Sequence, residues 1–193
     1  MENTTPDDES LFPETEVVFA RFGPRFGATL IDGILIMIVT LPFTYYNVIR
    51  WKIPELFLLT SIIAVVYKPF MEYKFSATLG KMAVGLLVVG HEFQRITLKE
   101  ELRRVSFYLI PNIISQIIIT PFYFSENFRM IKNFNEYNDY VTSANPALFW
   151  LNGIVIALFA ADCFTFFTNP QKRALHDVYA DTYVVERFNT NGH

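Results

Sequence analysis

The chain has 193 residues, of which 52% are hydrophobic, and it carries a formal net charge of -3. A negative net charge argues against nucleic acid as a partner. The single Cys163 excludes an internal disulfide bond.

Residues 1–20 are acidic and contain Pro6 and Pro13. This composition predicts a flexible cytoplasmic tail. The segment lacks the basic region and the short apolar core of a signal peptide. We therefore expect the first spanning helix to direct membrane insertion.

Four apolar stretches follow the tail, and each is close in length to the roughly 20 residues that cross a ~30 Å hydrocarbon core. They cover residues 28–49, 55–70, 105–124 and 148–168. The pattern predicts an all-α membrane protein with a bundle of four transmembrane helices. We expect one transmembrane domain over residues 21–186 and a C-terminal tail over residues 187–193.

The distribution of basic residues predicts the orientation. If the N-terminus is cytoplasmic, 11 Lys and Arg residues flank the spans on the inner side, and only Arg50, Lys52, Arg129 and Lys132 lie outside. Basic residues are enriched in cytoplasmic loops. We therefore expect a multi-pass protein of the cell membrane, most simply a bacterial inner membrane, with both termini in the cytoplasm.

The inner connection between the second and third spans contains residues 82–89, an apolar stretch too short to cross a bilayer. We expect a re-entrant or interfacial segment, or a short strand packed under the bundle. Thr97 and Glu100 have the spacing of a capping box, which predicts that a helix begins there and continues into the third span.

The outer connection, residues 125–146, alternates aromatic residues with Asn. Rings with polar neighbours suit the headgroup region, so this segment is either surface-lying or a docking site for another protein.

Ionisable residues lie inside segments that are otherwise apolar. A charge at bilayer depth costs about 2.5–3.5 kcal/mol, so it is normally paired, faces the bundle interior or marks a functional site. With the predicted orientation, these charges and two amides form a candidate ion or proton pathway in the cytoplasmic half of the membrane. Its members are Asp32, Lys68, Asn112, Gln116 and Asp162.

A purely structural interpretation of the same residues also stands. Lys68 would then pair with Asp162, and Arg25 with Asp32, to orient the helices, while the amides would join neighbouring helices.

The sequence does not contain a recognisable catalytic or metal-binding pattern. His176 and Asp177 are adjacent, and neighbours in sequence seldom face each other. His91, His176 and His193 lack metal-ligand spacing. We therefore expect no enzymatic activity, no cofactor and no metal.

Several short motifs occur in a fixed order. Arg25 precedes Asp32, Thr78-Leu79-Gly80-Lys81 follows the second span, and Leu102-Arg103-Arg104 and Leu175-His176-Asp177 come later. Together they resemble the RDD family of membrane proteins, which is named for an Arg and two Asp. The resemblance assigns Arg25, Asp32 and Asp177 to these positions. It also assigns a cytoplasmic loop motif of Thr78, Gly80, Lys81, Arg103, Arg104 and His176. Met82 departs from the family pattern, which usually has a basic residue there.

The resemblance implies transport for some family members, including cation/proton antiport, and assembly or scaffolding for others. One hypothesis is an oligomeric transporter in which Asp32 exchanges a proton for a cation in a cavity gated by Arg25. The other is a non-enzymatic membrane subunit whose polar residues hold the fold together and whose outer loop binds a partner. Both place the chain in a lipid bilayer with a second copy or another membrane protein.

We also expect Lys81 to lie near Asp177 and tie the loop to the tail.

Overall fold

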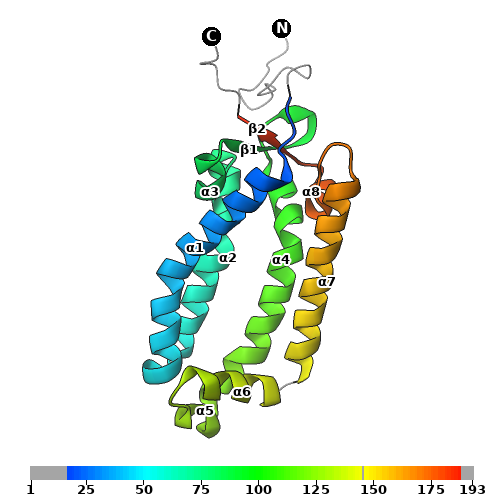
Figure 1. Cartoon of the computed structure of the whole chain (residues 1–193). Coiled ribbons are helices and arrows are strands. Elements are labelled where there is room, and N and C mark those ends of the chain that lie inside the picture. The colour runs from blue at the N-terminus through cyan, green and yellow to red at the C-terminus, as the bar shows by residue number, and fades with distance from the viewer. Residues whose placement is uncertain (1–16, 145, 188–193) are drawn as a thin grey trace. The chain divides into compact units, whose positions relative to one another are not determined.

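The computed structural model describes residues 17–144 and 146–187. Most of the predicted acidic tail (residues 1–16) and most of the C-terminal tail (residues 188–193) lie outside the described residues. Four helices are long and apolar enough to cross a membrane. They are α1 (Phe22–Tyr46, continued by η2, Asn47–Trp51), α2 (Pro54–Phe75), α4 (Leu98–Ile119, continued by η4, Thr120–Phe124) and α7 (Pro146–Thr168) (Figure 1). The predicted set of four apolar helices is confirmed.

Shorter elements lie between the long helices and after α7. They are α3 (Leu79–Ala83), β1 (Leu86–Val89), η3 (His91–Phe93), α5 (Glu126–Met130), α6 (Phe134–Ala144), α8 (Leu175–Ala180) and β2 (Tyr183–Glu186). The chain divides into two compact units. Within the described residues, we call 17–33, 68–106 and 161–187 the ionic unit, and 34–67, 107–144 and 146–160 the aromatic unit.

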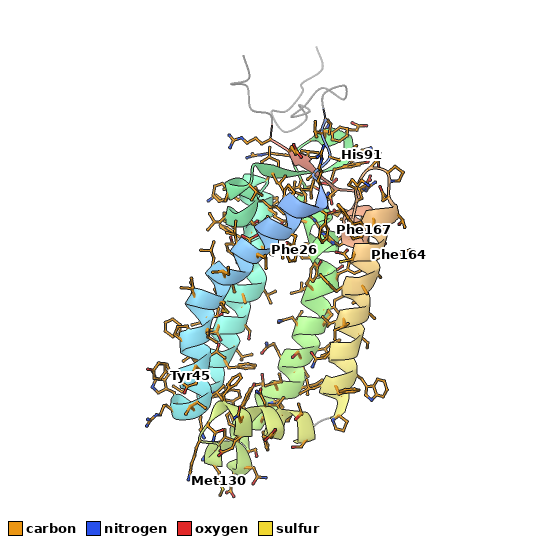
Figure 2. The ribbon with its side chains drawn as sticks, in the orientation of Figure 1. Phe26, Tyr45, His91, Met130, Phe164 and Phe167 are labelled. Carbon is orange, nitrogen blue, oxygen red and sulfur yellow. The ribbon has the colours of Figure 1, made fainter. Side chains whose placement is uncertain are left out.

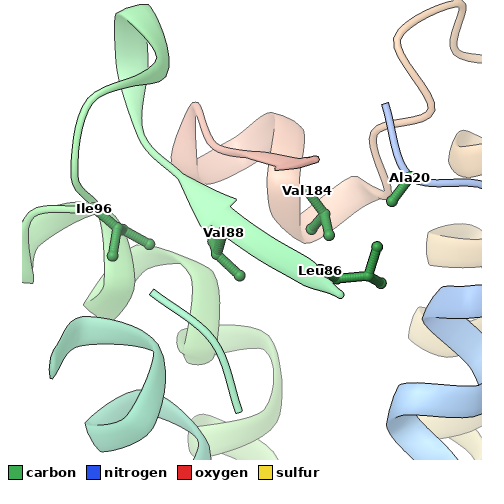
Figure 3. Packing of buried hydrophobic residues seen from close by; sticks show 5 residues of the cluster. All are labelled: Ala20, Leu86, Val88, Ile96 and Val184. Atoms are coloured by element: carbon green, nitrogen blue, oxygen red, sulfur yellow. The ribbon is translucent and has the colours of Figure 1, made fainter. Parts of the chain in front are cut away.

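The ionic unit contains a small antiparallel sheet. β1 pairs with β2 so that Leu86 is opposite Glu186 and Val89 is opposite Tyr183. The apolar stretch at residues 82–89 therefore ends as a strand, which was one of the alternatives that the sequence left open. Its apolar side packs into a core of Ala20, Leu86, Val88, Ile96 and Val184 (Figure 3).

The two ends of the described chain meet at this sheet. The Ala20 amide donates to the carbonyl oxygen of Val184 (3.0 Å), and the Glu186 amide donates to that of Val18 (2.9 Å). Residues 17–20, which we assigned to a flexible tail, pair with β2. Ala20 is fully buried there, in the core beside β1, whereas Val18 remains exposed.

The capping box at the start of α4 is confirmed. The Thr97 amide donates to Glu100 Oε2 (2.7 Å), and the Glu100 amide donates to Thr97 Oγ1 (3.3 Å). These reciprocal bonds satisfy amides that the first turn of a helix leaves without partners, so α4 begins where the sequence predicted.

The aromatic unit is organised around buried rings. Tyr123 and Phe128 have ring centroids 4.5 Å apart, and Phe57 stacks on Tyr123 at 5.1 Å. Lys52 follows η2, and its Nζ donates to the carbonyl oxygens of Phe128 (3.0 Å), Arg129 (2.6 Å) and Ile131 (2.7 Å). The connection that was predicted to lie outside thus contains two helices, α5 and α6, and one lysine binds the carbonyl oxygens at the end of α5.

The long helices expose their apolar side chains along most of their length, as Figure 2 shows for labelled residues such as Phe26 and Phe164. Fully buried side chains include Arg104, Glu72 and Glu101. A protein in water has the opposite arrangement, because exposed apolar surface and buried charge are both unfavourable there. In a bilayer these exposed apolar side chains would contact lipid tails. The arrangement therefore agrees with long helices that span a membrane.

Candidate functional site

A group of buried and partly buried charged residues lies in the ionic unit and comes from six helices. We call it the ionic cluster, and its members are Arg25 (α1), Glu72 (α2), Lys81 (α3), Arg104 (α4), Asp162 (α7), and His176 and Asp177 (α8).

Glu72 joins three of these helices. Its side chain is fully buried, Lys81 Nζ donates to its Oε1 (2.7 Å), and Arg104 Nη1 donates to its Oε2 (2.8 Å). A buried carboxylate is tolerated only when it is paired and hydrogen-bonded. The two cations meet this requirement and fix α3 and α4 to the end of α2.

Asp177 is the second buried carboxylate of the cluster. Arg25 Nη1 donates to its Oδ2 (2.7 Å), and Arg104 Nη2 lies 3.0 Å from its Oδ1 in an ion-pair contact. The contact with Arg104 is not an aligned hydrogen bond, since Oδ1 accepts none within the described residues. Burial raises the pKa of Asp177, but the nearby charges of His176, Arg104 and Arg25 hold it well below its usual value of 3.8. Asp177 is therefore ionised at neutral pH, and Arg104 connects it to Glu72.

His176 lies between two carboxylates. Its Nδ1 is 2.7 Å from Asp162 Oδ1, and its Nε2 is 3.2 Å from Asp177 Oδ1. The His176 amide also donates to Asp162 Oδ1 (3.1 Å). The expectation that His176 and Asp177 face apart is wrong, because Asp162 holds the imidazole on the buried side of α8. This contact joins α7 to the rest of the cluster.

Lys81 is buried in the middle of the five-residue helix α3. Burial lowers its pKa to about 8, although the charge of Glu72 raises it, and the positive charges of Arg104 and Lys68 lower it further. The expected tie between Lys81 and Asp177 is indirect. Lys81 contacts Glu72, and Arg104 carries the connection from Glu72 to Asp177.

Glu101 also lies among these charges, on the buried side of α4. It is fully buried, and neither carboxylate oxygen has a hydrogen-bond partner within the described residues. Such a group is costly unless something offsets its charge. Among the residues of the ionic unit that the structure describes, Glu101 is therefore the least satisfied charge.

Sequence reasoning missed the two fully buried glutamates, Glu72 and Glu101, although signals existed. Glu72 follows Lys68 by one helical turn, and α2 continues beyond residue 70, where we ended the span. Glu101, Arg104 and Val105 have the i, i+3, i+4 spacing of a buried helix face, and all three are buried.

Asp32 occupies a different place from the ionic cluster. Thr78 Oγ1 donates to its Oδ2 (2.6 Å), and the Gly80 amide donates to its Oδ1 (2.8 Å). Thr78 in turn caps α3, because its Oγ1 accepts from the Lys81 amide (3.3 Å). A Cβ on Gly80 would overlap the Ala28 carbonyl oxygen, so only glycine allows α3 to approach α1 this closely.

Of the three motif residues, Arg25 and Asp177 thus form an ion pair, and Asp32 accepts hydrogen bonds from the start of α3. The structural alternative that pairs Arg25 with Asp32 is wrong, since Arg25 binds Asp177 and Asp32 binds the start of α3. Arg103, the exposed neighbour of Arg104, lies outside the ionic cluster.

The residues of the predicted pathway contact different partners. Asp162 binds His176 rather than Lys68, whose charge acts on Lys81. Gln116 Nε2 donates to Ser61 Oγ (2.8 Å), and both residues belong to the aromatic unit. Asn112 is half-buried in the same unit. Over residues 17–144 and 146–187, no three His, Cys, Asp or Glu side chains are grouped to hold a metal ion.

Comparison with known proteins gives one positive result. The model of the RDD family matches residues 19–181, which include every motif position named above. Comparisons with curated proteins and with solved structures found no match. Because the family match covers most of the sequence, this chain belongs to the RDD family of membrane proteins.

Proposed function

We propose that this chain is a non-enzymatic membrane subunit that presents a folded cytoplasmic surface, built from α3, α8 and the two-stranded sheet, to a membrane-protein partner. The contacts of Asp32 carry the proposal. Both of its carboxylate oxygens accept hydrogen bonds from the segment that begins α3.

A carboxylate that exchanges a proton for a cation must release its partners in each cycle. Asp32 instead binds a side-chain hydroxyl and a backbone amide that together start a helix. Releasing them would undo the Thr78 cap and the approach of α3 to α1. These contacts favour a structural role for Asp32 over the exchange that the sequence suggested.

The charge distribution supports a cytoplasmic position for the ionic unit. Of the 16 Lys and Arg residues, four lie in the aromatic unit and twelve in the ionic unit. The positive-inside rule then favours the ionic unit, with both chain ends, on the inner side of a bacterial cell membrane.

Helix α7 supports assembly with a second copy or another membrane protein. Gly153, Ala157 and Ala161 repeat every fourth residue, which lets a neighbouring helix approach closely. A Cβ built on Gly153 meets nothing within 4 Å, so this part of α7 is open.

The test measures the stability of the fold and the proton flux of the same variants. The purified protein is placed in liposomes with an internal pH dye, and cation-driven proton flux per folded molecule is measured with the melting temperature. We expect no flux above empty vesicles from the wild type. Asp32→Asn and Thr78→Val should both lower the melting temperature, because they remove the same hydrogen bond, whereas Thr78→Ser should preserve it. Wild-type flux that Asp32→Asn abolishes and Thr78→Val retains would restore the exchanger hypothesis.

A second candidate, proton-coupled transport through the ionic unit, is favoured by Lys81 and Glu101. Lys81 has a pKa of about 8, and the buried oxygens of Glu101 lack hydrogen bonds within the described residues. Perturbed groups of this kind are enriched at functional sites. Here, flux should survive Asp32→Asn and be lost in Glu101→Gln, which reverses the pattern expected for exchange at Asp32.

A further inference from the structure

We propose that a groove at the start of α4 binds an anionic phospholipid, with the phosphate on two basic side chains and the upper acyl chain along two leucines. The groove lies in the ionic unit and has a volume of about 560 Å³. It is lined by Leu98, Lys99, Leu102, Arg103, Ser106 and Tyr179.

The groove is lined by one row of apolar side chains and one row of basic side chains, both along α4. Leu98 and Leu102 are one helical turn apart, and each is about half exposed (53% and 52%). Lys99 and Arg103 have the same spacing, one position further along. An amphipathic anion is the ligand that would use both rows at once.

The two basic residues are not neutralised by any carboxylate of the described residues. Within the part of the chain that the structure describes, neither Lys99 nor Arg103 forms an ion pair. The adjacent Arg104 contacts Glu72 and Asp177. The charge of α4 is therefore compensated on its buried side and open on the groove side, where a phosphate would complement it.

The position along the chain points to a lipid rather than to a soluble anion. The groove occupies the first turns of a helix that is apolar enough to span the membrane, and the predicted topology places these turns at headgroup level. Tyr179 presents a ring and a hydroxyl at the same place, as aromatic residues do at membrane interfaces. Basic residues near the anionic leaflet each contribute about 1 kcal/mol to lipid attraction.

The test uses the full chain in a zwitterionic detergent. Phosphatidylglycerol and phosphatidylcholine with identical acyl chains are titrated separately, and bound lipids are counted by native mass spectrometry. We expect the wild type to prefer phosphatidylglycerol. Lys99→Gln with Arg103→Gln should weaken that binding roughly 30-fold, the equivalent of two basic contacts. The control Lys74→Gln with Arg95→Gln removes equal charge from the same unit, outside the groove, and should change the affinity by less than about threefold.

Three further experiments identify the kind of ligand: a leucine variant, competition by inorganic phosphate and photolabelling. Leu102→Ser should weaken phosphatidylglycerol binding and leave competition by inorganic phosphate unchanged, and its melting temperature in phosphatidylcholine reports whether the fold is intact. A photoreactive phosphatidylglycerol should label the segment 98–106. Equal binding of the two lipids by the wild type, or equal loss in both double variants, would overturn the proposal. Inorganic phosphate that binds as tightly as the lipid would make this an anion site, and a groove that binds only an acidic protein would make it a partner site. Either result rejects the phospholipid.

Discussion

The two units of this chain bury different chemistry. In the ionic unit the fully buried side chains include Glu72, Glu101 and Arg104, whereas in the aromatic unit the ring of Phe128 is among the largest of them. The ionic unit holds most of its helices through a few charged contacts of 2.7–3.2 Å. The aromatic unit relies on ring packing and on one lysine that binds three carbonyl oxygens.

This difference determines how each unit should respond to mutation. In a bilayer, apolar contact between helices gains little over contact with lipid tails, so directed contacts and close packing hold helices together. Removing one member of a buried ion pair leaves the other unpaired, which is far costlier than losing part of a ring contact. We expect single changes to cost most in the ionic unit.

Arg104→Met tests this expectation at the residue that joins Glu72 to Asp177. The variant leaves two buried carboxylates without this cation, so the free energy of unfolding should fall by about 3–5 kcal/mol. Unfolding by a titration of sodium dodecyl sulfate in mixed micelles measures it. Arg95→Met removes an exposed Arg from the same unit and should stay within about 0.5 kcal/mol of the wild type. Similar values for both variants would show that the ionic cluster does not hold the unit together.

Gly80→Ala tests the close approach of α3 to α1. The added Cβ would overlap the Ala28 carbonyl oxygen and lie 2.9 Å from Asp32 Cγ, so α3 must shift. Overpacking of this kind costs about 1–3 kcal/mol. Gly27→Ala adds the same methyl on α1, where nothing lies within 4 Å, and should be neutral or slightly stabilising. The same unfolding titration measures both, and equal losses would place the strain elsewhere.

Lys52→Met tests the aromatic unit. The change removes the ammonium that binds the carbonyl oxygens of Phe128, Arg129 and Ile131. Lys52 is only half-buried, so water can replace part of these bonds, and the cost should be about 1–2 kcal/mol. Lys132→Met, an exposed control, should have almost no effect. A loss for Lys52→Met as large as that for Arg104→Met would erase the distinction between the units.

The local patterns of the sequence predicted the elements that depend on neighbouring residues. Apolar length indicated the four long helices, and the spacing of Thr97 and Glu100 indicated the start of α4. Both signals lie within one helix or one turn, where hydrogen-bond partners are close in sequence. The strand pairing of residues 86–89 with 183–186 joins segments far apart in the chain, so the sequence could only offer it as one alternative.

The sequence indicated many residues of the candidate site but not which residues they contact. Arg25, Asp32, Lys81, Arg104 and Asp177 were all selected, yet the structural alternative paired Arg25 with Asp32, whereas Arg25 binds Asp177 and Asp32 binds Thr78. A shared helix face indicates where a side chain can point, but the partner is set by which other helix packs there. Asp177 reaches Arg25 across 152 positions of sequence, a distance at which residue spacing carries no information.

The smallest predicted effects concern Glu100 and Glu101, which are adjacent in α4. Replacing each by Gln should change the free energy of unfolding in opposite directions. Glu101 is buried beside Glu72 without a hydrogen bond to either oxygen in the described residues, so Glu101→Gln removes a charge that lacks hydrogen-bond partners and keeps the shape. Its free energy of unfolding should rise by about 1 kcal/mol. Glu100 instead accepts from the Thr97 and His91 amides, so Glu100→Gln weakens the cap and should lose about 0.5–1 kcal/mol.

The detergent titration used above resolves both signs when the two variants are compared directly with the wild type. A loss of more than about 1 kcal/mol in Glu101→Gln would contradict the assignment of Glu101 as the least satisfied charge, because a neutral isostere costs that much only where the carboxylate had a partner. Repeating the titration with added Na⁺ and with K⁺ would then show whether a bound cation is that partner. A cation that stabilises the wild type and not Glu101→Gln would mean that the ionic unit is completed by an ion rather than by side chains alone, since a ligand bound only to the folded state raises its stability.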